Sequence, residues 1–185
     1  MKVIAASQVN GRADTTDKAL KATLGQWLPS PPRRIDRLIL QALLGAALLR
    51  DRARSDCGLY LASRYPARPT MSALLEAVCV QHKQPKPFEF VNSVSNAAGF
   101  HVAQQLGLEG PNLFIGAGPR VWPQLLALAA LDLHDGVTGQ ALLLVCDERG
   151  DFCVQAALLE GQTPQPLATD FASLTSALEI HHLEL

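Results

Sequence analysis

Apolar and polar positions along the chain fall into blocks that predict both strands and helices. The apolar-rich start, Lys2 to Val9, is typical of a strand. The more polar stretch that follows predicts a loop and one short helix around Lys18 to Trp27. After the breaker Leu28-Pro29-Ser30-Pro31-Pro32, apolar residues recur at helical spacing from Ile35 to Leu49. That helix is apolar almost all round, so we expect both of its sides to be covered.

The rest of the chain continues the alternation of strands and helices. The strands we expect are Gly58–Ser63, an extended Phe88–Val91, Leu113–Ile115, Ala141–Val145 and Phe152–Leu158. The helices we expect run from an N-cap at Thr70 through Cys79, from a cap at Asn96 to Leu106, from Pro119 through Leu131, and from Ala168 to Leu178. This order predicts an α/β fold with a mainly parallel sheet flanked by helices. Ligands of such sheets bind where strands end and helices begin, and the sharpest junction is Ile115 to Arg120.

Composition narrows the possible functions. The 185 residues carry a formal net charge of -1, which gives no electrostatic footprint for nucleic acid or for a membrane surface. No apolar run is long enough to span a membrane or to form a signal peptide, so we expect a cytoplasmic protein. Only 18% of the residues are charged, against about 25% in an average domain. We therefore expect an apolar surface that a partner covers.

The four cysteines show no metal-binding pattern. Cys57, Cys79, Cys146 and Cys153 form no CxxC and have no histidine at ligand spacing. Three of them lie in apolar runs, where cysteine is usually a small core residue. The sequence thus indicates no metal and no cofactor.

One stretch carries a family resemblance. The run Ser93-Val94-Ser95-Asn96-Ala97-Ala98-Gly99-Phe100-His101, followed by Gly-Leu-x-Gly-Pro at 107–111, resembles the β-ketoacyl synthase segment before the catalytic cysteine. The Arg-Ile-Asp-Arg helix, the Gly-Leu-Tyr-Leu-Ala-Ser strand and the Ala-Leu-Leu-Leu-Val-Cys-Asp-Glu strand fit the same pattern. The chain resembles in particular the chain-length-factor-like subunits of aryl-polyene and other type II polyketide clusters. The resemblance is strongest over 35–159 and implies one domain, 1–185, that is the N-terminal half of a thiolase-like fold.

Two departures from the family imply that this chain lacks its catalysis. The family's two catalytic histidines lie in the second half of the fold, so His101, His134, His181 and His182 do not correspond to them. We expect His101 to be a hydrogen-bonded structural residue. The resemblance places Pro119 where the catalytic cysteine belongs, and proline offers neither a thiol nor an N–H for an oxyanion.

Other residues that could replace the nucleophile are weaker candidates. Cys146 and Cys153 lie near Asp147 but have no histidine at a recognisable spacing, and buried thiols are usually inert. Ser93 and Ser95 flank a turn, where serine more often bonds the backbone. The glycines before Pro119 lack the Lys-Ser/Thr of a phosphate loop. We assign no catalytic residue.

The resemblance implies where partners bind. In the family, the strand before the nucleophile position pairs across the dimer axis, which here implicates Asn112, Leu113, Phe114 and Ile115. The resemblance also aligns a segment that lines the acyl pocket across the dimer with Phe88, Glu89 and Phe90. In an extended strand the two phenylalanine rings would share one face. The alternative is an ordinary half-buried strand whose phenylalanines belong to the core. Because acyl carrier proteins are acidic, we expect one to dock on basic residues, and these cluster on either side of the first long helix. These are Arg33, Arg34, Arg37, Arg50, Arg52 and Arg54.

Two functions of different class remain. The first is a non-catalytic, chain-length-factor-like subunit that binds a full-length β-ketoacyl synthase and shapes its acyl pocket, in polyketide, aryl-polyene or fatty-acid-type biosynthesis. The second is a homodimeric acyl-binding protein, or an acyltransferase with a relocated nucleophile.

Overall fold

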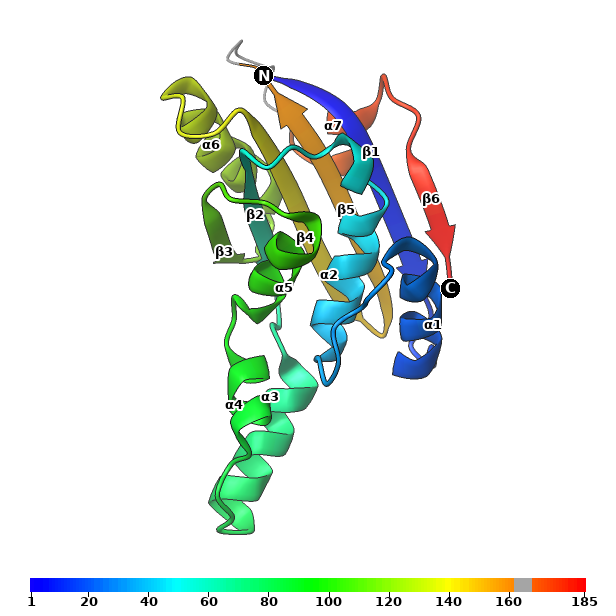
Figure 1. Ribbon diagram of the computed structural model, residues 1–185, viewed down its shortest axis with the longest axis vertical. Helices are drawn as coiled ribbons and strands as arrows, with labels where there is room; N and C mark the ends of the chain where they lie inside the picture. The colour runs from blue at the N-terminus through cyan, green and yellow to red at the C-terminus, as the bar shows by residue number, and fades with distance from the viewer. Residues whose placement is uncertain (162–167) are drawn as a thin grey trace.

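The computed structural model describes residues 1–161 and 168–185 (Figure 1). Its strands are β1 (Lys2–Gly11), β2 (Cys57–Ser63), β3 (Asn112–Gly116), β4 (Gln140–Arg149), β5 (Asp151–Glu160) and β6 (His181–Glu184). Its helices are α1 (Asp17–Trp27), α2 (Arg37–Ala47), α3 (Arg68–Leu75), α4 (Pro87–Ser93), α5 (Ala97–Leu106), α6 (Val121–His134) and α7 (Phe171–Thr175). A 3₁₀ turn, η1 (Arg50–Arg52), follows α2, and a π-helical turn, η2 (Glu76–Val80), extends α3.

The six strands form one mixed sheet in the order β3-β2-β4-β5-β1-β6. β2 is parallel to both β3 and β4, and β6 is parallel to β1. β5 is antiparallel to both of its neighbours. The predicted α/β class with a mainly parallel, mixed sheet is confirmed, and β3 lies at one edge of that sheet.

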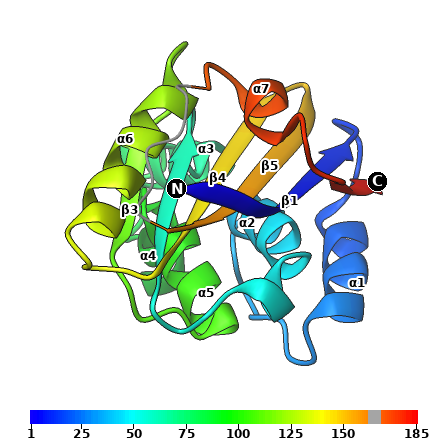
Figure 2. The same cartoon turned by 90° about the horizontal axis from the view of Figure 1, so that it is seen from above.

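Helices cover both faces of the sheet, as Figure 2 shows from above. On one face α2 is buried along nearly its whole length, because α1 and α5 pack on its flanks while the sheet lies beneath it. Asp36 caps this helix by accepting the Leu38 N–H at 2.8 Å. On the other face α6 and α7 close a second core, in which the rings of Trp122 and Phe171 lie 5.2 Å apart.

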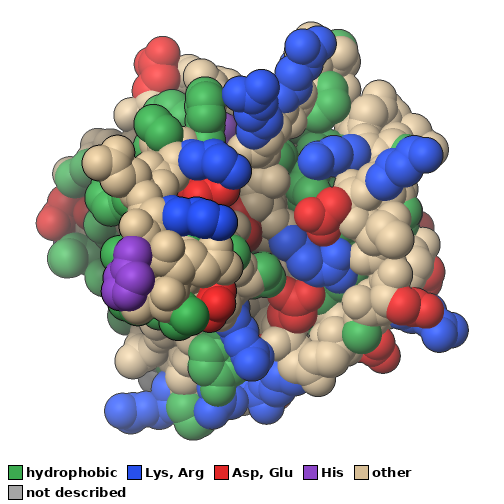
Figure 3. Space-filling view, turned by 90° about the horizontal axis from the view of Figure 1, so that it is seen from below, with side chains coloured by type: hydrophobic (Ala, Val, Ile, Leu, Met, Phe, Trp, Pro, Cys, Tyr) green, Lys and Arg blue, Asp and Glu red, His purple; other side chains and the backbone are tan. Residues whose placement is uncertain are grey.

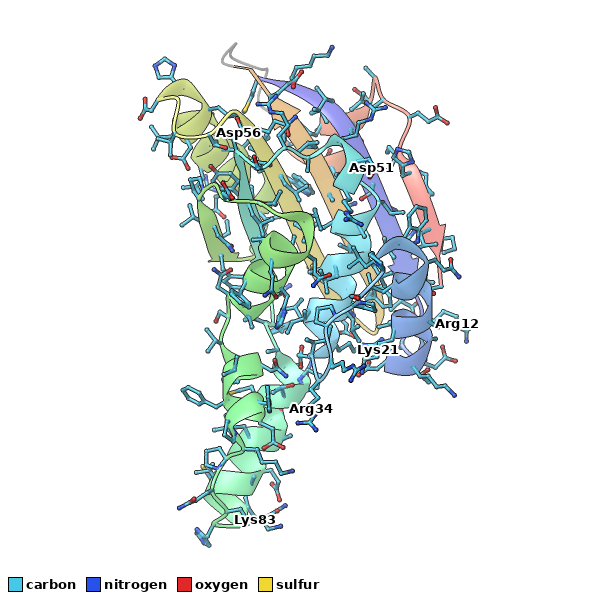
Figure 4. All side chains as sticks on the ribbon, viewed as in Figure 1. Arg12, Lys21, Arg34, Asp51, Asp56 and Lys83 are labelled. Carbon is cyan, nitrogen blue, oxygen red and sulfur yellow. The ribbon has the colours of Figure 1, made fainter. Side chains whose placement is uncertain are left out.

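A helical arm projects from the body of the molecule (Figure 1). It consists of α3, η2 and α4, with α4 folded back against α3. Figure 4 places Arg34 where the arm joins the body and Lys83 near its tip. The arm is the connection between β2 and α5, two elements that pack against each other in the body of the molecule.

Several expected boundaries differ from the structure. Thr70 is not an N-cap: α3 begins at Arg68, and the Thr70 hydroxyl donates to the Asp36 carboxylate instead. The tail helix is short, covering Phe171–Thr175, because Asp170 caps it and the chain then turns toward β6. Sequence analysis missed β6, whose four residues are too few for a period-two pattern.

Candidate functional site

The turn between β3 and α6 holds the position that the resemblance assigns to a nucleophile. β3 ends at Gly116, and the Ala117 N–H then donates to the carbonyl of Ser63 at 3.0 Å. The Val121 N–H donates to the carbonyl of Gly118 at 3.1 Å. Pro119 lies inside this turn and is exposed. The turn therefore presents a ring without a donor or a nucleophilic atom.

The expectation that Pro119 opens the helix is wrong, because α6 begins at Val121. The reason is a second proline, Pro123. In a helix starting at Pro119, Pro123 would stand beyond the first turn, where its missing N–H breaks an i→i−4 hydrogen bond. With Val121 as the first residue, Pro123 lies inside the first turn. Backbone N–H groups there have no intrahelical acceptor, so the missing N–H of Pro123 breaks no hydrogen bond.

The buried thiols are poor nucleophiles in this structure. Burial raises the pKa of Cys57 to about 12, and it also raises the pKa of Cys146 and of Cys153. A thiol with a raised pKa stays protonated at neutral pH, and the thiolate is the reactive form. Cys79 is exposed on the arm.

His101 differs from the expected hydrogen-bonded residue. Its Nδ1 is buried and has no partner within the described part of the chain. The ring packs edge-on against Phe100, with centroids 5.3 Å apart, and burial lowers the pKa of His101. Within the described residues, His101 on α5 thus contacts Phe100 and makes no hydrogen bond through Nδ1.

The Gly-Leu-x-Gly-Pro motif serves to place β3. Gly107 ends α5 in the left-handed region, with φ of 69°, which favours glycine. A Cβ built on Gly110 would lie 2.6 Å from the carbonyl oxygen of Cys57. The neighbouring Pro111 carbonyl accepts the Leu59 N–H at 2.7 Å. The motif thus holds the chain against β2 immediately before β3.

β3 has one hydrogen-bonded neighbour and one open edge in the described sheet. Asn112 and Leu113 begin the strand, and Leu113 is 41% exposed. Phe114 packs on the α2 side of the sheet and Ile115 on the α6 side. Open strand edges are sites where a second chain can pair.

The expectation of an extended segment at Phe88–Val91 is wrong, because these residues lie in the helix α4. Pro87 is the first residue of that helix, and the Lys86 N–H donates to Glu89 at 3.4 Å. These start signals outweigh a period-two pattern only four residues long. Successive helical residues are rotated by about 100° around the helix axis. Phe88 and Phe90 are two residues apart, so they lie on nearly opposite sides of α4. The two rings therefore do not share a face.

Exposed apolar side chains occur on the arm, on α5 and at the sheet edge, with Phe88 and Phe90 on opposite sides of α4; we call this set the apolar strip. Its members come from α4, the following loop, α5 and β3, which lie along one side of the molecule (Figure 1). They are Phe88, Phe90, Val91, Val94, Phe100 and Leu113, between 41% and 60% exposed. These six side chains are part of the exposed apolar surface that the low charged fraction of the sequence predicts.

The six candidate arginines fall into two groups at opposite ends of α2. Arg33 and Arg34 precede the helix and Arg37 is its first residue, while Arg50, Arg52 and Arg54 follow it. Figure 4 shows the separation, with Arg34 at the arm and Asp51 and Asp56 at the far end. The eleven residues of α2 place the groups about 16 Å apart. The two groups are therefore separate candidates for contact with an acidic partner.

Two of these arginines are engaged within the protein. The Arg37 guanidinium donates to Glu148 at 2.7 Å and to Asp17 at 3.2 Å. Arg54 donates to Asp56 at 3.0 Å and lies 3.7 Å from Glu160. Arg33, Arg34, Arg50 and Arg52 are exposed. These four remain the freer candidates for an acidic partner.

Two searches of the described residues gave no site. Residues 1–161 and 168–185 contain no group of three or more His, Cys, Asp or Glu side chains that could hold a metal ion. Within the same ranges, no helix is both long and apolar enough to cross a bilayer.

Comparison with known proteins bears on the fold. No protein-family model and no curated protein matches this sequence. Among solved structures, the ishigamide ketosynthase/chain length factor matches with a TM-score of 0.64 at 18% identity, over 75% of this chain and 47% of that chain. A ketosynthase in complex with its chain length factor from Xenorhabdus doucetiae matches with a TM-score of 0.64 at 15% identity, over 95% of this chain and 88% of that chain. The fold is thiolase-like.

The thiolase-like chain spans about half of its larger relatives. One chain matches in the structure of a type II polyketide acyl carrier protein in complex with its ketosynthase. Its TM-score is 0.60 at 12% identity, over 86% of this chain and 57% of that chain. By contrast, the matched Xenorhabdus chain is nearly as short as this one. At these identities the likeness establishes the fold alone.

Sequence reasoning placed β3 and Pro119 near one another, but it missed two features of this region. The apolar strip was missed because its members come from separate elements; only the low charged fraction hinted at it. A cavity beside the start of α2 was also missed. The polar residue Gln41 inside the apolar helix was the available signal for it.

Proposed function

We propose that this chain is a non-catalytic, chain-length-factor-like subunit that forms a heterodimer with an active β-ketoacyl synthase. In this proposal residues 1–185 act as one N-terminal-half domain, in polyketide, aryl-polyene or fatty-acid-type biosynthesis. The observation that carries it is the open edge of β3 beside the apolar strip. A half-sized thiolase-like domain that leaves such an edge exposed favours a permanent partner, since obligate interfaces resemble a core cut in half.

The turn before α6 supports a non-catalytic role. Pro119 offers no nucleophile and no backbone donor. A single oxyanion donor is worth about 3 kcal/mol of transition-state stabilisation in comparable sites. The raised pKa values of Cys57, Cys146 and Cys153 argue against a nucleophile relocated to those thiols. The short chain matched in the Xenorhabdus complex is compatible with a half-length partner of a ketosynthase.

The proposal assigns a steric role to the arm. Phe88 lies under Arg34, whose guanidinium carbon is 5.5 Å from the ring centroid. Phe90 is 60% exposed and points to another side of α4. We therefore assign Phe90 as the ring that forms part of the partner's acyl-pocket wall. In the reconstituted complex, Phe90→Ala should shift the product distribution toward longer chains, whereas Phe88→Ala should not.

A carrier-protein contact is the least supported part of the proposal. Arg33 and Arg34 adjoin the arm, and positive charge there would speed encounter with an acidic carrier protein. Arg33→Glu should slow carrier-dependent turnover at low salt without dissolving the complex. Arg52→Glu, at the other end of α2, is the matched control. Equal turnover in the two variants would remove this contact from the proposal.

Co-expression with a full-length β-ketoacyl synthase from the same organism, followed by size exclusion, tests the function. We expect one peak that contains both chains in equal amounts. If the two chains never co-elute and the ketosynthase is fully active alone, the proposal fails. A homodimer that is acylated by an acyl thioester in the absence of any partner would support the acyl-binding or acyltransferase alternative.

A further inference from the structure

A cavity of about 320 Å³ lies between the starts of α2 and α3, above the carboxyl ends of β2 and β4. Ser63 and Cys146, which pair across β2 and β4, form part of its wall. None of its lining residues belongs to the apolar strip or to the turn around Pro119. Figure 3 views the molecule from below and shows Lys and Arg side chains around this end, with Asp and Glu among them. The cavity is therefore separate from the proposed heterodimer surface.

An unsatisfied amide lines the cavity. Gln41 is 1% exposed, and its Nε2 has no hydrogen-bond partner within the described chain. It stands on α2 among leucines and alanines, where an apolar side chain would avoid this cost. Leaving a buried donor unsatisfied is destabilising, because the group loses its hydrogen bonds to water without gaining others. An acceptor placed in the cavity would remove that cost.

The start of α3 adds further donors at the same place. Its N-cap residue, Ala67, has φ of 48° and provides no side-chain hydrogen bond. The first N–H groups of a helix have no intrahelical partner and favour negative charge. Pro69, the second residue of α3, has no N–H, so the free donors here belong to the residues on either side of it. Arg68, the first residue of α3, lines the cavity, and its guanidinium carbon lies 5.8 Å from the ring centroid of Tyr65. Among the described residues, Arg68 forms no ion pair.

Two carboxylates also line the cavity, but both already have donors. Asp36 accepts the Leu38 N–H at 2.8 Å and the Thr70 hydroxyl. Glu148 accepts from Arg37 at 2.7 Å. The donors of Gln41, Arg68 and the α3 terminus have no such partner among the described residues, and a bound acceptor would satisfy them.

We propose that this cavity binds the oxyanion group, a carboxylate or a phosphate, of a small molecule. The acceptor oxygens would take the Gln41 Nε2–H, the Arg68 guanidinium and the free N–H groups of α3. Leu38 and Pro69 supply apolar wall for a short carbon chain attached to the anion. Binding needs this chain alone, so it is independent of the heterodimer.

Calorimetric titration of the purified chain with inorganic phosphate and with acetate, each at constant ionic strength, tests the proposal. We expect saturable binding of at least one anion, and the two arms identify which group the cavity takes. Gln41→Leu and Arg68→Gln should each weaken binding about tenfold or more. Arg64→Gln is the matched control: Arg64 lies 5.6 Å from the same Tyr65 ring but does not line the cavity. Its affinity should stay within about twofold.

Thermal unfolding separates binding from folding in these variants. Without ligand, Gln41→Leu should unfold no earlier than the parent chain, because leucine removes an unsatisfied donor. Three results would overturn the proposal: neither anion binds saturably, Gln41→Leu keeps the parent affinity, or Arg64→Gln weakens binding as much as Arg68→Gln.

Discussion

The Arg37 Nε lies 2.7 Å from Glu148 Oε1 and joins the first residue of α2 to the end of β4. The same guanidinium donates to the Thr15 carbonyl at 2.7 Å and lies 5.5 Å from the Phe152 ring centroid. Burial by itself lowers the pKa of Arg37, but the hydrogen bonds to Glu148 and Asp17 outweigh it, so the net pKa is raised. One side chain thus ties α2 to β4, β5 and the segment before α1.

Replacing Arg37 should destabilise the fold measurably. Its side chain is only 14% exposed, and a hydrogen bond to a charged group contributes about 1.5–3 kcal/mol. Glu148 and Asp17 are partly exposed, so water can replace some of this when Arg37 is removed. We expect Arg37→Met to lower the free energy of unfolding by about 2 kcal/mol in urea titrations. Arg12→Met removes an exposed ion pair with Asp14 and should change it by less than about 0.5 kcal/mol. Similar losses in both variants would contradict this role.

The sequence predicted the elements whose residues carry a long, regular signal. The apolar run of α2, the strands β2, β4 and β5, and the helix α5 were all confirmed. The short strand β6 and the helix α4 were not predicted, because four to seven residues carry too little periodicity to decide between states. The start of α6 also depended on Pro123, which lies four residues after Pro119, the residue that was expected to begin the helix.

The candidate site was only partly accessible to sequence reasoning. The position of Pro119 followed from motif spacing, but the apolar strip depends on how α4, α5 and β3 come together. Arg37 was assigned to a surface although tertiary contacts engage it. Such contacts join residues that are far apart in the chain, so no local periodicity or motif in a single sequence predicts them.

Stability should fall at alkaline pH, partly because of Tyr60. Burial and a 2.6 Å hydrogen bond to Asp132 raise the Tyr60 pKa above the ordinary tyrosine value of 10.0. Above that pH the unfolded chain loses the phenol proton while the folded chain keeps it, so stability is complete below pH 10 and falls as pH rises. Burial of Cys57 acts in the same direction between pH 9 and about 12.

Tyr60→Phe isolates this contribution. At pH 7 the variant should lose about 1 kcal/mol of unfolding free energy, because the hydrogen bond to Asp132 is gone. Between pH 10 and pH 12 its unfolding free energy should fall less steeply than that of the parent chain. Parallel pH profiles from urea unfolding would show that Tyr60 does not titrate differently on folding.

The close approach at Gly110 should make this position intolerant of a side chain. Because the nearest atom is the backbone carbonyl of Cys57, at 2.6 Å from an added Cβ, the chain must shift to accommodate it. We expect Gly110→Ala to cost about 1–3 kcal/mol in chemical unfolding. Gly118→Ala is the control, since no atom lies within 4 Å of its added Cβ. A tolerant Gly110 would mean that the motif does not position β3.

Introducing a thiol at Pro119 should not create a synthase. Pro119 is exposed in its turn, so Pro119→Cys is expected to fold and to react with iodoacetamide. The exposed Cys79 is alkylated in parent and variant alike and serves as an internal control. A lone nucleophile without its acid–base partners loses nearly all of the rate. Mass spectrometry should therefore detect alkylation but no β-ketoacyl product; such a product from this chain alone would contradict the non-catalytic role.

The most direct test of the heterodimer uses two variants of equal exposure. Phe100 on α5 lies in the apolar strip and is 58% exposed, while Leu131 on α6 lies outside it and is 59% exposed. After co-expression with the ketosynthase, light scattering coupled to size exclusion reports the mass of the complex. We predict that Phe100→Asp abolishes co-elution, whereas Leu131→Asp elutes as an equimolar heterodimer. Loss of the complex in Leu131→Asp, or an intact complex in Phe100→Asp, would contradict the account.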